Sequence, residues 1–353
     1  MKTALKTMLS NGFRLWLLGI YLASSWPIMA QTDSAFTVHS SFLLKASPTP
    51  AQCHASTLVQ LKDSSIMVAW FAGSYEGAKD VCIWASTLRQ NAWQTPAQLV
   101  CGGSHETPEP CWNPVLALLP HDSLCLYYKQ GPNPRQWTGM AMASSDHGKN
   151  WSAPIQLPNI LGPIRNKPFI TPKGTIIFPS SRETDTTWFV VMERSTDRGL
   201  TFQTLRIAAQ PSVKAIQPVL LPLQNGGILA LCRSNQNVLM QTVSLDDGLT
   251  WSQLEPTQVA NPNAGIEALR LQSGKYLLVY NPLKSGKEWY NGRNQLSLAI
   301  SDDAYHWTYV GDIENQDSGE FSYPSAIQTP DGYVHITYTY NRKAIRYVKL
   351  KMR

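Results

Sequence analysis

The chain has 353 residues, of which 43% are hydrophobic, 10% aromatic and only 15% charged, and its formal net charge is +6. So few charges beside so many aromatic residues exclude a disordered chain or a coiled coil, and the length suffices for one large β domain or two ordinary domains. Without the N-terminal Lys2, Lys6 and Arg14 the charge is +3, which is too small to argue for nucleic-acid binding but compatible with anionic substrates.

Residues 1–30 have the pattern of a signal peptide. Basic residues precede an apolar stretch from Leu15 to Ser25, and the small residue Ala30 ends a plausible cleavage site. The apolar stretch is short for a membrane span, although an uncleaved anchor is the alternative. We therefore predict cleavage after Ala30, export to the periplasm or the medium, and no membrane attachment of the mature chain 31–353.

The mature chain contains six cysteine residues. Their even number permits disulfides in an oxidising compartment, and the six are Cys53, Cys82, Cys101, Cys111, Cys125 and Cys232. Cys101 and Cys111 bracket a loop rich in glycine and proline and are the first pair to test, whereas Cys82, Cys125 and Cys232 lie in apolar runs typical of buried thiols. No Cys/His cluster has the spacing of a zinc site, and we predict no cofactor.

A short motif, S-x-D-x-G-x-T-W, recurs at intervals of about fifty residues. It occurs at Ser144–Trp151, Ser195–Phe202 and Ser244–Trp251, with degraded copies at Ser86–Trp93 and Ser301–Trp307. The aspartate can accept backbone hydrogen bonds across a turn, the glycine supplies a positive φ, and the aromatic residue packs into a sheet. Each copy therefore predicts a hairpin between two strands.

A second period precedes these boxes: six polar residues each begin an apolar strand that ends in a turn and is followed by a further strand. They are His54, Asn113, Lys167, Gln217, Glu267 and Tyr323. Helical periodicity is nearly absent, so the pattern predicts a six-bladed β-propeller of four-stranded antiparallel blades in one domain, 31–353. Because the innermost strands of a propeller start at one mouth of its channel, we expect these six side chains to converge there. A water-filled, self-satisfied channel mouth is the alternative.

The boxes, together with Ala69–Gly73, Gly162–Pro168 and Glu320–Pro324, resemble the sialidase (neuraminidase) superfamily, in particular its bacterial branch with BNR/Asp-box repeats. The likeness covers roughly residues 50–350. It implies a retaining hydrolase with a tyrosine nucleophile, an aspartate acid/base and three arginines that hold the carboxylate of the substrate.

The resemblance assigns roles to individual residues. Tyr323 matches the nucleophile, Asp80 the acid/base, and Arg233 and Arg293 two of the three arginines. Glu76, in the same glycine-containing loop as Asp80, is an alternative acid.

Two departures from the family pattern stand out. His54 replaces the first arginine, and Gln217 stands where the carboxylate that activates the tyrosine is expected. Glu267 could supply that carboxylate, and Arg165 with Lys167 could restore the positive charge.

Three functions follow. The first is an exo-acting, sialidase-like hydrolase that removes a terminal acidic sugar from glycans, with Asn113, Gln217, Glu76 and Trp70 among its substrate contacts. The second is a lyase or glycosidase for uronate-containing polysaccharide, with His54 as base and Tyr323 as acid.

The third function is a non-catalytic carbohydrate-binding propeller, in which Trp70, Trp112 and Trp137 would stack on sugars. In each case the predicted partner is an acidic glycan, and we expect a monomer.

Overall fold

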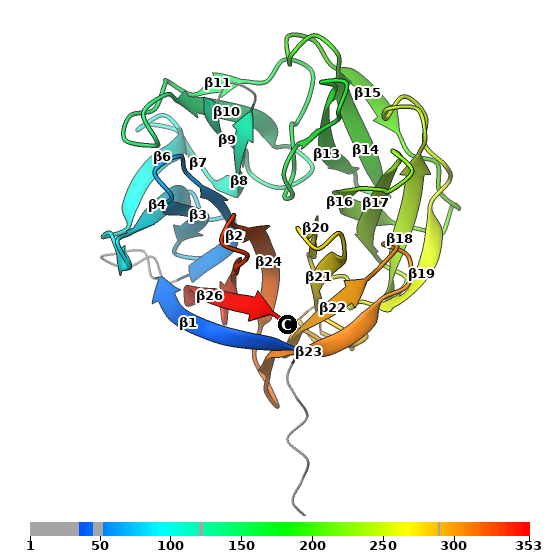
Figure 1. Cartoon of the computed structure of the whole chain (residues 1–353). Coiled ribbons are helices and arrows are strands. Elements are labelled where there is room, and N and C mark those ends of the chain that lie inside the picture. The colour runs from blue at the N-terminus through cyan, green and yellow to red at the C-terminus, as the bar shows by residue number, and fades with distance from the viewer. Residues whose placement is uncertain (1–34, 45–51, 120–122, 289) are drawn as a thin grey trace, which may run out of the picture. The chain divides into compact units, whose positions relative to one another are not determined.

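The computed structural model describes residues 35–44, 52–119, 123–288 and 290–353, and in these residues the secondary structure is β-strand without any α-helix. No segment of them forms an apolar helix of membrane-spanning length. Six antiparallel sheets stand side by side around a centre, so the prediction of a six-bladed β-propeller is confirmed (Figure 1). The predicted signal peptide, residues 1–30, lies outside the described residues.

The first three blades follow one another along the chain, each with its innermost strand first. Blade 1 is formed by β2 (Gln52–Gln60), β3 (Ile66–Gly73), β4 (Cys82–Arg89), β5 (Ala92–Trp93), β6 (Ala97–Gly103) and β7 (Pro108–Glu109). Blade 2 is formed by β8 (Cys111–Leu119), β9 (Ser123–Gln130), β10 (Thr138–Ser144) and β11 (Ile155–Gln156). Blade 3 is formed by β12 (Phe169–Ile170), β13 (Ile176–Glu183), β14 (Trp188–Ser195) and β15 (Gln203–Arg206).

The remaining blades repeat this order, except for the last. Blade 4 is formed by β16 (Ala215–Pro222), β17 (Ile228–Ser234), β18 (Val238–Ser244) and β19 (Glu255–Ala260). Blade 5 is formed by β20 (Glu267–Arg270), β21 (Tyr276–Tyr280), β22 (Gln295–Ser301) and β23 (Thr308–Asn315). Blade 6 is formed by β24 (Phe321–Gln328), β25 (Val334–Tyr340), β26 (Ala344–Met352) and β1 (Phe36–Leu44).

The burial of a strand follows its place in the blade. The second strand of blade 1, β3, is buried along its whole length, because both of its faces pack against neighbouring blades. The outer strand β19 has only exposed and half-buried residues. This gradient explains why the inner strands read as continuous apolar runs in the sequence, whereas the outer strands carry little pattern.

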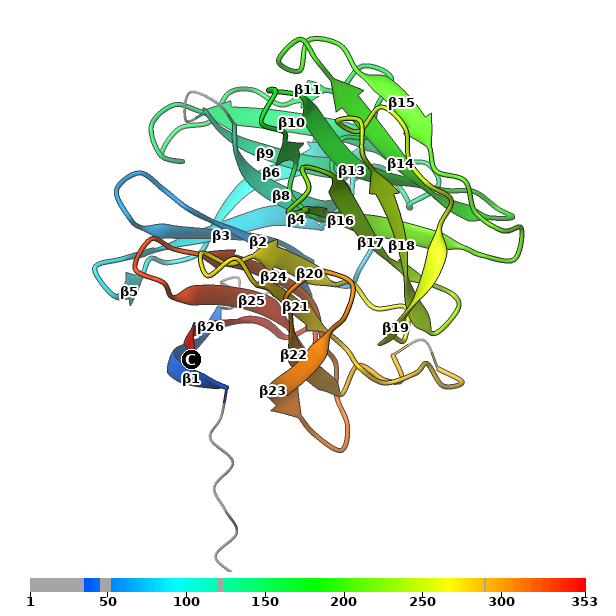
Figure 2. The same ribbon diagram turned by 45° about the vertical axis from the view of Figure 1, so that its right-hand side comes forward.

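Blade 6 joins the two ends of the described chain. Its outer strand β1 comes from the start of the chain and pairs with β26, from Phe36 opposite Met352 to Leu44 opposite Ile345 (Figures 1 and 2). Phe36 is buried and packs with residues of blade 5 such as Leu277. The chain thus closes the ring by hydrogen bonds between its first and last strands, and a sheet edge that would otherwise be open at blade 6 is covered.

The predicted hairpin boxes have the expected geometry. In Ser244–Trp251, Asp246 Oδ1 accepts from the Thr250 N–H at 2.8 Å, and Ser244 Oγ accepts from the Gly248 N–H at 2.9 Å. The glycines at the fifth position of the boxes, Gly148, Gly199 and Gly248, have φ of 78°, 87° and 78°. The hydrogen bonds from Thr250 lower the pKa of Asp246 to about 2.

The boxes lie at the end of the blades away from the starts of the innermost strands. In blade 2, Ser144 at the beginning of the box pairs with Leu124, and the neighbouring Ser123 pairs with Leu119 at the end of β8. The boxes therefore stabilise hairpins on the opposite side of the propeller from the predicted channel mouth.

We predict that Asp246→Asn lowers the thermal unfolding midpoint by a few degrees at pH 7. The pKa of Asp246 is about 2 in the folded protein, below its ordinary value of 3.8, so its stabilisation is present above the unfolded pKa and is lost as the pH falls through the folded pKa. The difference from wild type should therefore narrow between pH 4 and pH 2 in calorimetric scans. Asp317→Asn, at an exposed position outside any box, is the control; equal midpoints for both variants at pH 7 would contradict the prediction.

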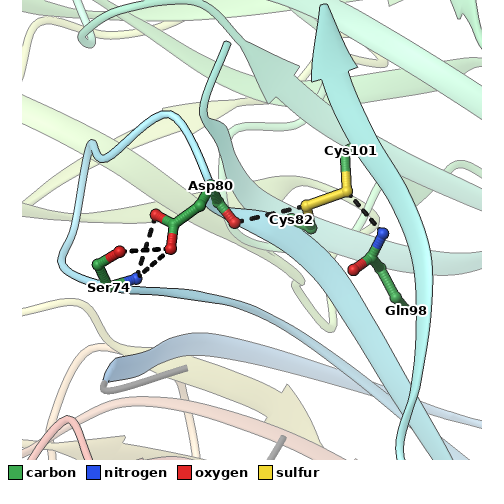
Figure 3. Close-up of a disulfide and its surroundings, with 5 residues drawn as sticks. All are labelled: Ser74, Asp80, Cys82, Gln98 and Cys101. Atoms are coloured by element: carbon green, nitrogen blue, oxygen red, sulfur yellow. Dashed lines mark hydrogen bonds between the residues drawn. A yellow bond between two sulfur atoms is a disulfide. The ribbon is translucent and has the colours of Figure 1, made fainter. Parts of the chain in front are cut away.

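Cys82 and Cys101 form a disulfide, so the predicted pair Cys101–Cys111 is wrong (Figure 3). The two cysteines face each other on adjacent antiparallel strands, β4 and β6, with Cα atoms 4.3 Å apart. Cys111 instead begins β8 of the next blade and is buried, as are Cys125 and Cys232. The disulfide joins residues that face each other on neighbouring strands, and the sequence did not show that Cys82 lies opposite Cys101.

We predict that Cys82→Ala/Cys101→Ala reduces the free energy of unfolding by about 3 kcal/mol, the value expected from the entropy of a closed loop of this length. The two cysteines are 19 residues apart. Urea unfolding of the wild type should shift to lower urea when a reductant is added, whereas the double variant should not respond. A reductant effect of equal size on both proteins would show that another thiol is responsible.

Candidate active site

Four innermost strands share one irregularity near their starts. The register of β2, β8, β16 and β24 shifts by a bulge, and the first bulged residues, Ala55, Asn113, Gln217 and Tyr323, have φ of 52°, 42°, 57° and 55°. Left-handed backbone costs on the order of 1–3 kcal/mol at a non-glycine residue and is concentrated at functional sites. The same strained position thus faces one mouth of the propeller in four blades.

In blade 1 this position is Ala55, so the prediction that aligned His54 with Asn113, Gln217 and Tyr323 is wrong by one residue. The proline that follows the bulged residue in the other three blades is absent here, where Ser56 follows Ala55. The His54 ring nevertheless lies against Tyr323, with the ring centroids 4.3 Å apart. His54 is thus part of the site because its ring contacts Tyr323, although it does not occupy the bulged position of the repeat.

Tyr323 lies at a cleft of ≈ 520 Å³, with 8% of its surface exposed. Three guanidinium groups surround its ring: the Cζ atoms of Arg165, Arg233 and Arg293 are 5.2, 5.4 and 5.9 Å from the ring centroid. Gly265 leaves room for this arrangement, because a Cβ there would lie 2.9 Å from Arg165 Nε and 3.3 Å from Tyr323 Cγ. A phenol thus stands within a cluster of cations.

The three arginines come from three blades. Arg165 precedes β12 and donates to Asn166 Oδ1 at 2.8 Å and to the Pro324 carbonyl; Arg233 is in β17; Arg293 precedes β22. Burial lowers the pKa of Arg165 to about 10 and also lowers that of Arg293. Guanidinium groups this far removed from water bind a carboxylate more strongly than exposed ones, because water competes less.

His54 is a neutral imidazole in this site. Burial lowers its pKa well below the ordinary value, and the nearby cations Arg342 and Arg293 lower it further. Its Nδ1 lies 2.8 Å from Thr339 Oγ1, a residue of blade 6. The His54 ring is therefore uncharged in the free protein where it contacts the Tyr323 ring.

Glu267 and Lys167 meet deeper in the channel. Glu267 Oε2 accepts from Ser325 Oγ at 3.1 Å and from the Ala326 N–H at 3.3 Å, and Lys167 Nζ lies 3.9 Å from it. Lys167 also donates to Ser325 Oγ at 3.2 Å. The Glu267 carboxylate is thus engaged with the two residues that follow Pro324, and its bonds are not directed to the phenol of Tyr323.

Glu76 and Asp80 belong to one loop but lie differently. Both oxygens of Asp80 accept from the Ser74 N–H, at 3.2 and 3.0 Å, and Asp80 also binds the Ser74 hydroxyl, which closes the loop between β3 and β4 (Figure 3). Glu76 lines the cleft together with Tyr323, Arg233 and Arg293. Of these two carboxyl groups, the structure brings Glu76 to the cleft.

The other predicted contacts differ in placement. Asn113 and Gln217 are buried at their bulges, and Gln217 Oε1 has no hydrogen-bond partner among the described residues. The prediction that Trp70 contacts the substrate is wrong, because Trp70 is fully buried between blades, beside Ile345 and Tyr347.

Trp112 and Trp137 also cannot serve as stacking platforms. They pack on each other with ring centroids 6.0 Å apart and are only 7% and 8% exposed. The tryptophans that were predicted to bind sugars in a non-catalytic propeller are therefore too buried to stack on a sugar.

Arg342 is a site residue that the sequence analysis missed. It sits in the turn between β25 and β26, lines the cleft, donates from Nε to Glu320 Oε2 at 2.8 Å and from Nη1 to Glu76 Oε2. Glu320 Oε1 in turn accepts from Arg293 Nη1 at 3.0 Å. A hairpin turn carries no strand pattern, so only the position of Arg342 between two strands could have pointed to it.

A buried ionic cluster holds the segment that presents Arg165. The Glu193 carboxylate accepts from the N–H groups of Leu161 and Gly162 at 2.9 and 2.8 Å, and Lys129 Nζ donates to the Pro163 carbonyl at 2.8 Å. Both side chains are fully buried. Blades 2 and 3 thus fix the backbone two residues before Arg165.

We predict that Glu193→Gln costs about 3–5 kcal/mol of folding free energy, because it removes the buried carboxylate that pairs with Arg182 at 3.6 Å and offsets the charge of the buried Lys129. Urea unfolding of Glu193→Gln, Lys129→Met and the double variant tests this. The double variant should lose less than the sum of the two single variants, since it buries no uncompensated charge. Strict additivity would show that the two side chains act independently.

The chain matches the family model described as BNR repeat-like domain over residues 64–336 and belongs to this family. No curated protein matches it. Among solved structures, a protein of unknown function from Dyadobacter fermentans is similar with a TM-score of 0.74 at 16% identity, over 90% of this chain and 100% of that one.

Sialidases are also similar in structure. The Hadza microbial sialidase Hz136 has a TM-score of 0.70 at 15% identity, over 88% of this chain and 68% of its own. The sialidase of Trypanosoma rangeli with the inhibitor DANA has a TM-score of 0.69 at 14% identity, over 89% of this chain and 60% of its own. These likenesses show that the chain has the same propeller fold as these sialidases.

Proposed function

We propose that this protein is an exo-acting glycoside hydrolase that removes a terminal acidic sugar, sialic acid or a related sugar, with retention of configuration. The observation that carries the proposal is the Tyr323 phenol at the cleft, within 6 Å of three guanidinium groups. The sialidase-type fold supports it. A sugar whose anomeric carbon bears a carboxylate is held by guanidiniums and repels an anionic nucleophile, and a phenol avoids that repulsion.

The residues of the site supply each step. Tyr323 Oη bonds to the anomeric carbon while its proton passes to His54. Glu76, which is ionised in its pair with Arg342 in the free protein, takes up a proton from solvent once the sugar is bound, and the glycosidic oxygen leaves with that proton. In the second step a water gives a proton to Glu76 and its oxygen to the anomeric carbon, and the released Tyr323 oxygen recovers its proton from His54. Glu76 takes the role predicted for Asp80 in this proposal, because Glu76 lines the cleft beside Tyr323 and Asp80 does not.

A second function is favoured by one observation: the Glu267 carboxylate is bound to Ser325 and Ala326, while His54 lies against Tyr323. In a uronate lyase, His54 would remove the proton from C5 of the sugar, and Tyr323 would protonate the departing oxygen at C4. The electron pair of the broken C–H bond then forms a C4–C5 double bond. Hydrolysis and elimination therefore leave different products from the same cleft.

The place of action is also a proposal. The basic and apolar pattern of residues 1–30 supports export, and the disulfide between Cys82 and Cys101 suits an oxidising compartment. We propose that the enzyme acts in the periplasm or outside the cell.

Tyr323→Phe should reduce kcat by about 10²–10⁴-fold on the active substrate, because it removes the oxygen that bonds to, or protonates, the sugar. The assay is a panel of aryl sialosides and uronate-bearing oligosaccharides. A hydrolase releases the free acidic sugar, whereas a lyase releases an unsaturated sugar that absorbs ultraviolet light.

Tyr309→Phe, at an exposed position on the outer strand β23, is the control for this substitution. A Tyr323→Phe variant with full activity would reject both mechanisms.

A further inference from the structure

We propose that the Glu76 carboxylate is an internal ligand of the cleft: in the free protein it occupies the cleft-facing side of Arg342, and an acidic sugar binds by displacing it. This inference rests on the proposed function, since it assumes an acidic sugar. Glu76 Oε2 accepts from Arg342 Nη1, and both residues line the cleft beside Tyr323.

Arg342 is bound by two carboxylates of different character. Glu320 is buried, with 9% of its side chain exposed, and also binds Arg293 Nη1 at 3.0 Å and Ser322 Oγ at 2.8 Å. The side chain of Glu76 is 37% exposed. Among the described residues, Arg342 is the side chain that the Glu76 carboxylate binds.

This difference in burial decides which carboxylate can leave. Water can solvate the exposed carboxylate of Glu76 once it is released, whereas a buried carboxylate that leaves its partner has no such compensation. Glu320 therefore remains as the permanent counter-ion of Arg342 and Arg293, and Glu76 is the partner that exchanges.

The loop of Glu76 is fixed, so the exchange needs only a side-chain rotation. Asp80 closes the loop onto Ser74, the Cys82–Cys101 disulfide follows directly, and the Glu76 N–H donates to Gln52 Oε1 at 3.2 Å (Figure 3). A Cβ at Gly77 would lie 3.1 Å from the Trp112 ring, so the loop backbone rests against the next blade.

Charge balance explains what such an exchange achieves. Four cations, Arg165, Arg233, Arg293 and Arg342, lie close enough to lower the pKa of His54. Glu76 offsets part of their mutual repulsion in the free protein, and the carboxylate of an acidic sugar does so in the complex. A neutral sugar cannot replace Glu76 without leaving Arg342 one counter-ion short, so the pair selects for anionic ligands. Displaced Glu76 then faces the bound sugar and is free to exchange protons with it.

Titration calorimetry with N-acetylneuraminic acid, glucuronic acid and the methyl ester of the first tests the proposal. Glu76→Gln should bind the acids about ten-fold more tightly than wild type, because no competing carboxylate has to be removed, and it should not change binding of the ester. Glu288→Gln removes a different exposed carboxylate of the same cleft and should leave affinity near that of wild type.

The gain should disappear when Arg342 is changed. Glu76→Gln should give no increase in affinity in an Arg342→Met background, and a reduced one in Arg342→Lys, which serves if the methionine variant does not fold.

The outcomes separate the two proposals. Equal or weaker binding by Glu76→Gln, or an equal gain in the Arg342→Met background, would overturn the internal ligand while the acidic-sugar site stands. Failure of wild type and Glu76→Gln alike to bind any acid would reject the proposed function itself.

Discussion

The site depends on closure of the ring between blades 6 and 1. The pairing of β1 with β26 completes blade 6, and beside it the Cys53 N–H donates to the Arg342 carbonyl at 2.6 Å and the Ala55 N–H to Thr339 Oγ1 at 3.2 Å. Across the same seam His54 lies against Tyr323, and Glu76 binds Arg342. The side chains of the candidate site therefore come from both ends of the chain and meet only when the last blade is complete. The contacts that close the ring between blades 6 and 1 are therefore also the contacts that hold the site together.

The distribution of charge follows from that geometry. Guanidinium groups from three blades surround the Tyr323 ring and a fourth, Arg342 of blade 6, lines the same cleft, and such a set is tolerable only if carboxylates are placed among them. Glu320 satisfies two of the arginines from a buried position, Glu267 lies deeper in the channel beside Lys167, and Glu193 fixes the segment before Arg165. Each buried carboxylate has its own hydrogen bonds, which explains how the fold keeps so many arginines out of water. Glu76 differs from these three carboxylates because its side chain is exposed to solvent.

Much of this could be predicted from the sequence, because the repeat carries it. The boxes and the six strand starts predicted the propeller and placed Tyr323 at the channel mouth, and the resemblance to sialidases added Arg233 and Arg293. What failed depended on local register. One residue of shift at the blade 1 bulge moved Ala55 into the place expected for His54, and strand pairing joined Cys82 to Cys101. Arg342 and Glu193 were missed because a turn residue and a buried ionic cluster leave no periodic mark.

At two positions where the family resemblance predicts a charged residue, this protein has a neutral one, and this limits the chemistry of the site. At the position expected for an activating carboxylate stands Gln217, and where an arginine is expected in blade 1 stands His54, kept neutral by burial and by the surrounding cations. Around the Tyr323 ring, therefore, the protein itself supplies guanidiniums and a neutral base. The positive charges of these arginines repel one another in a partly desolvated cleft. An anion that enters the cleft reduces this repulsion and is attracted by several arginines at once. In the function that we propose, the substrate brings the negative charge that balances these arginines, and this is why we propose an acidic sugar as the ligand.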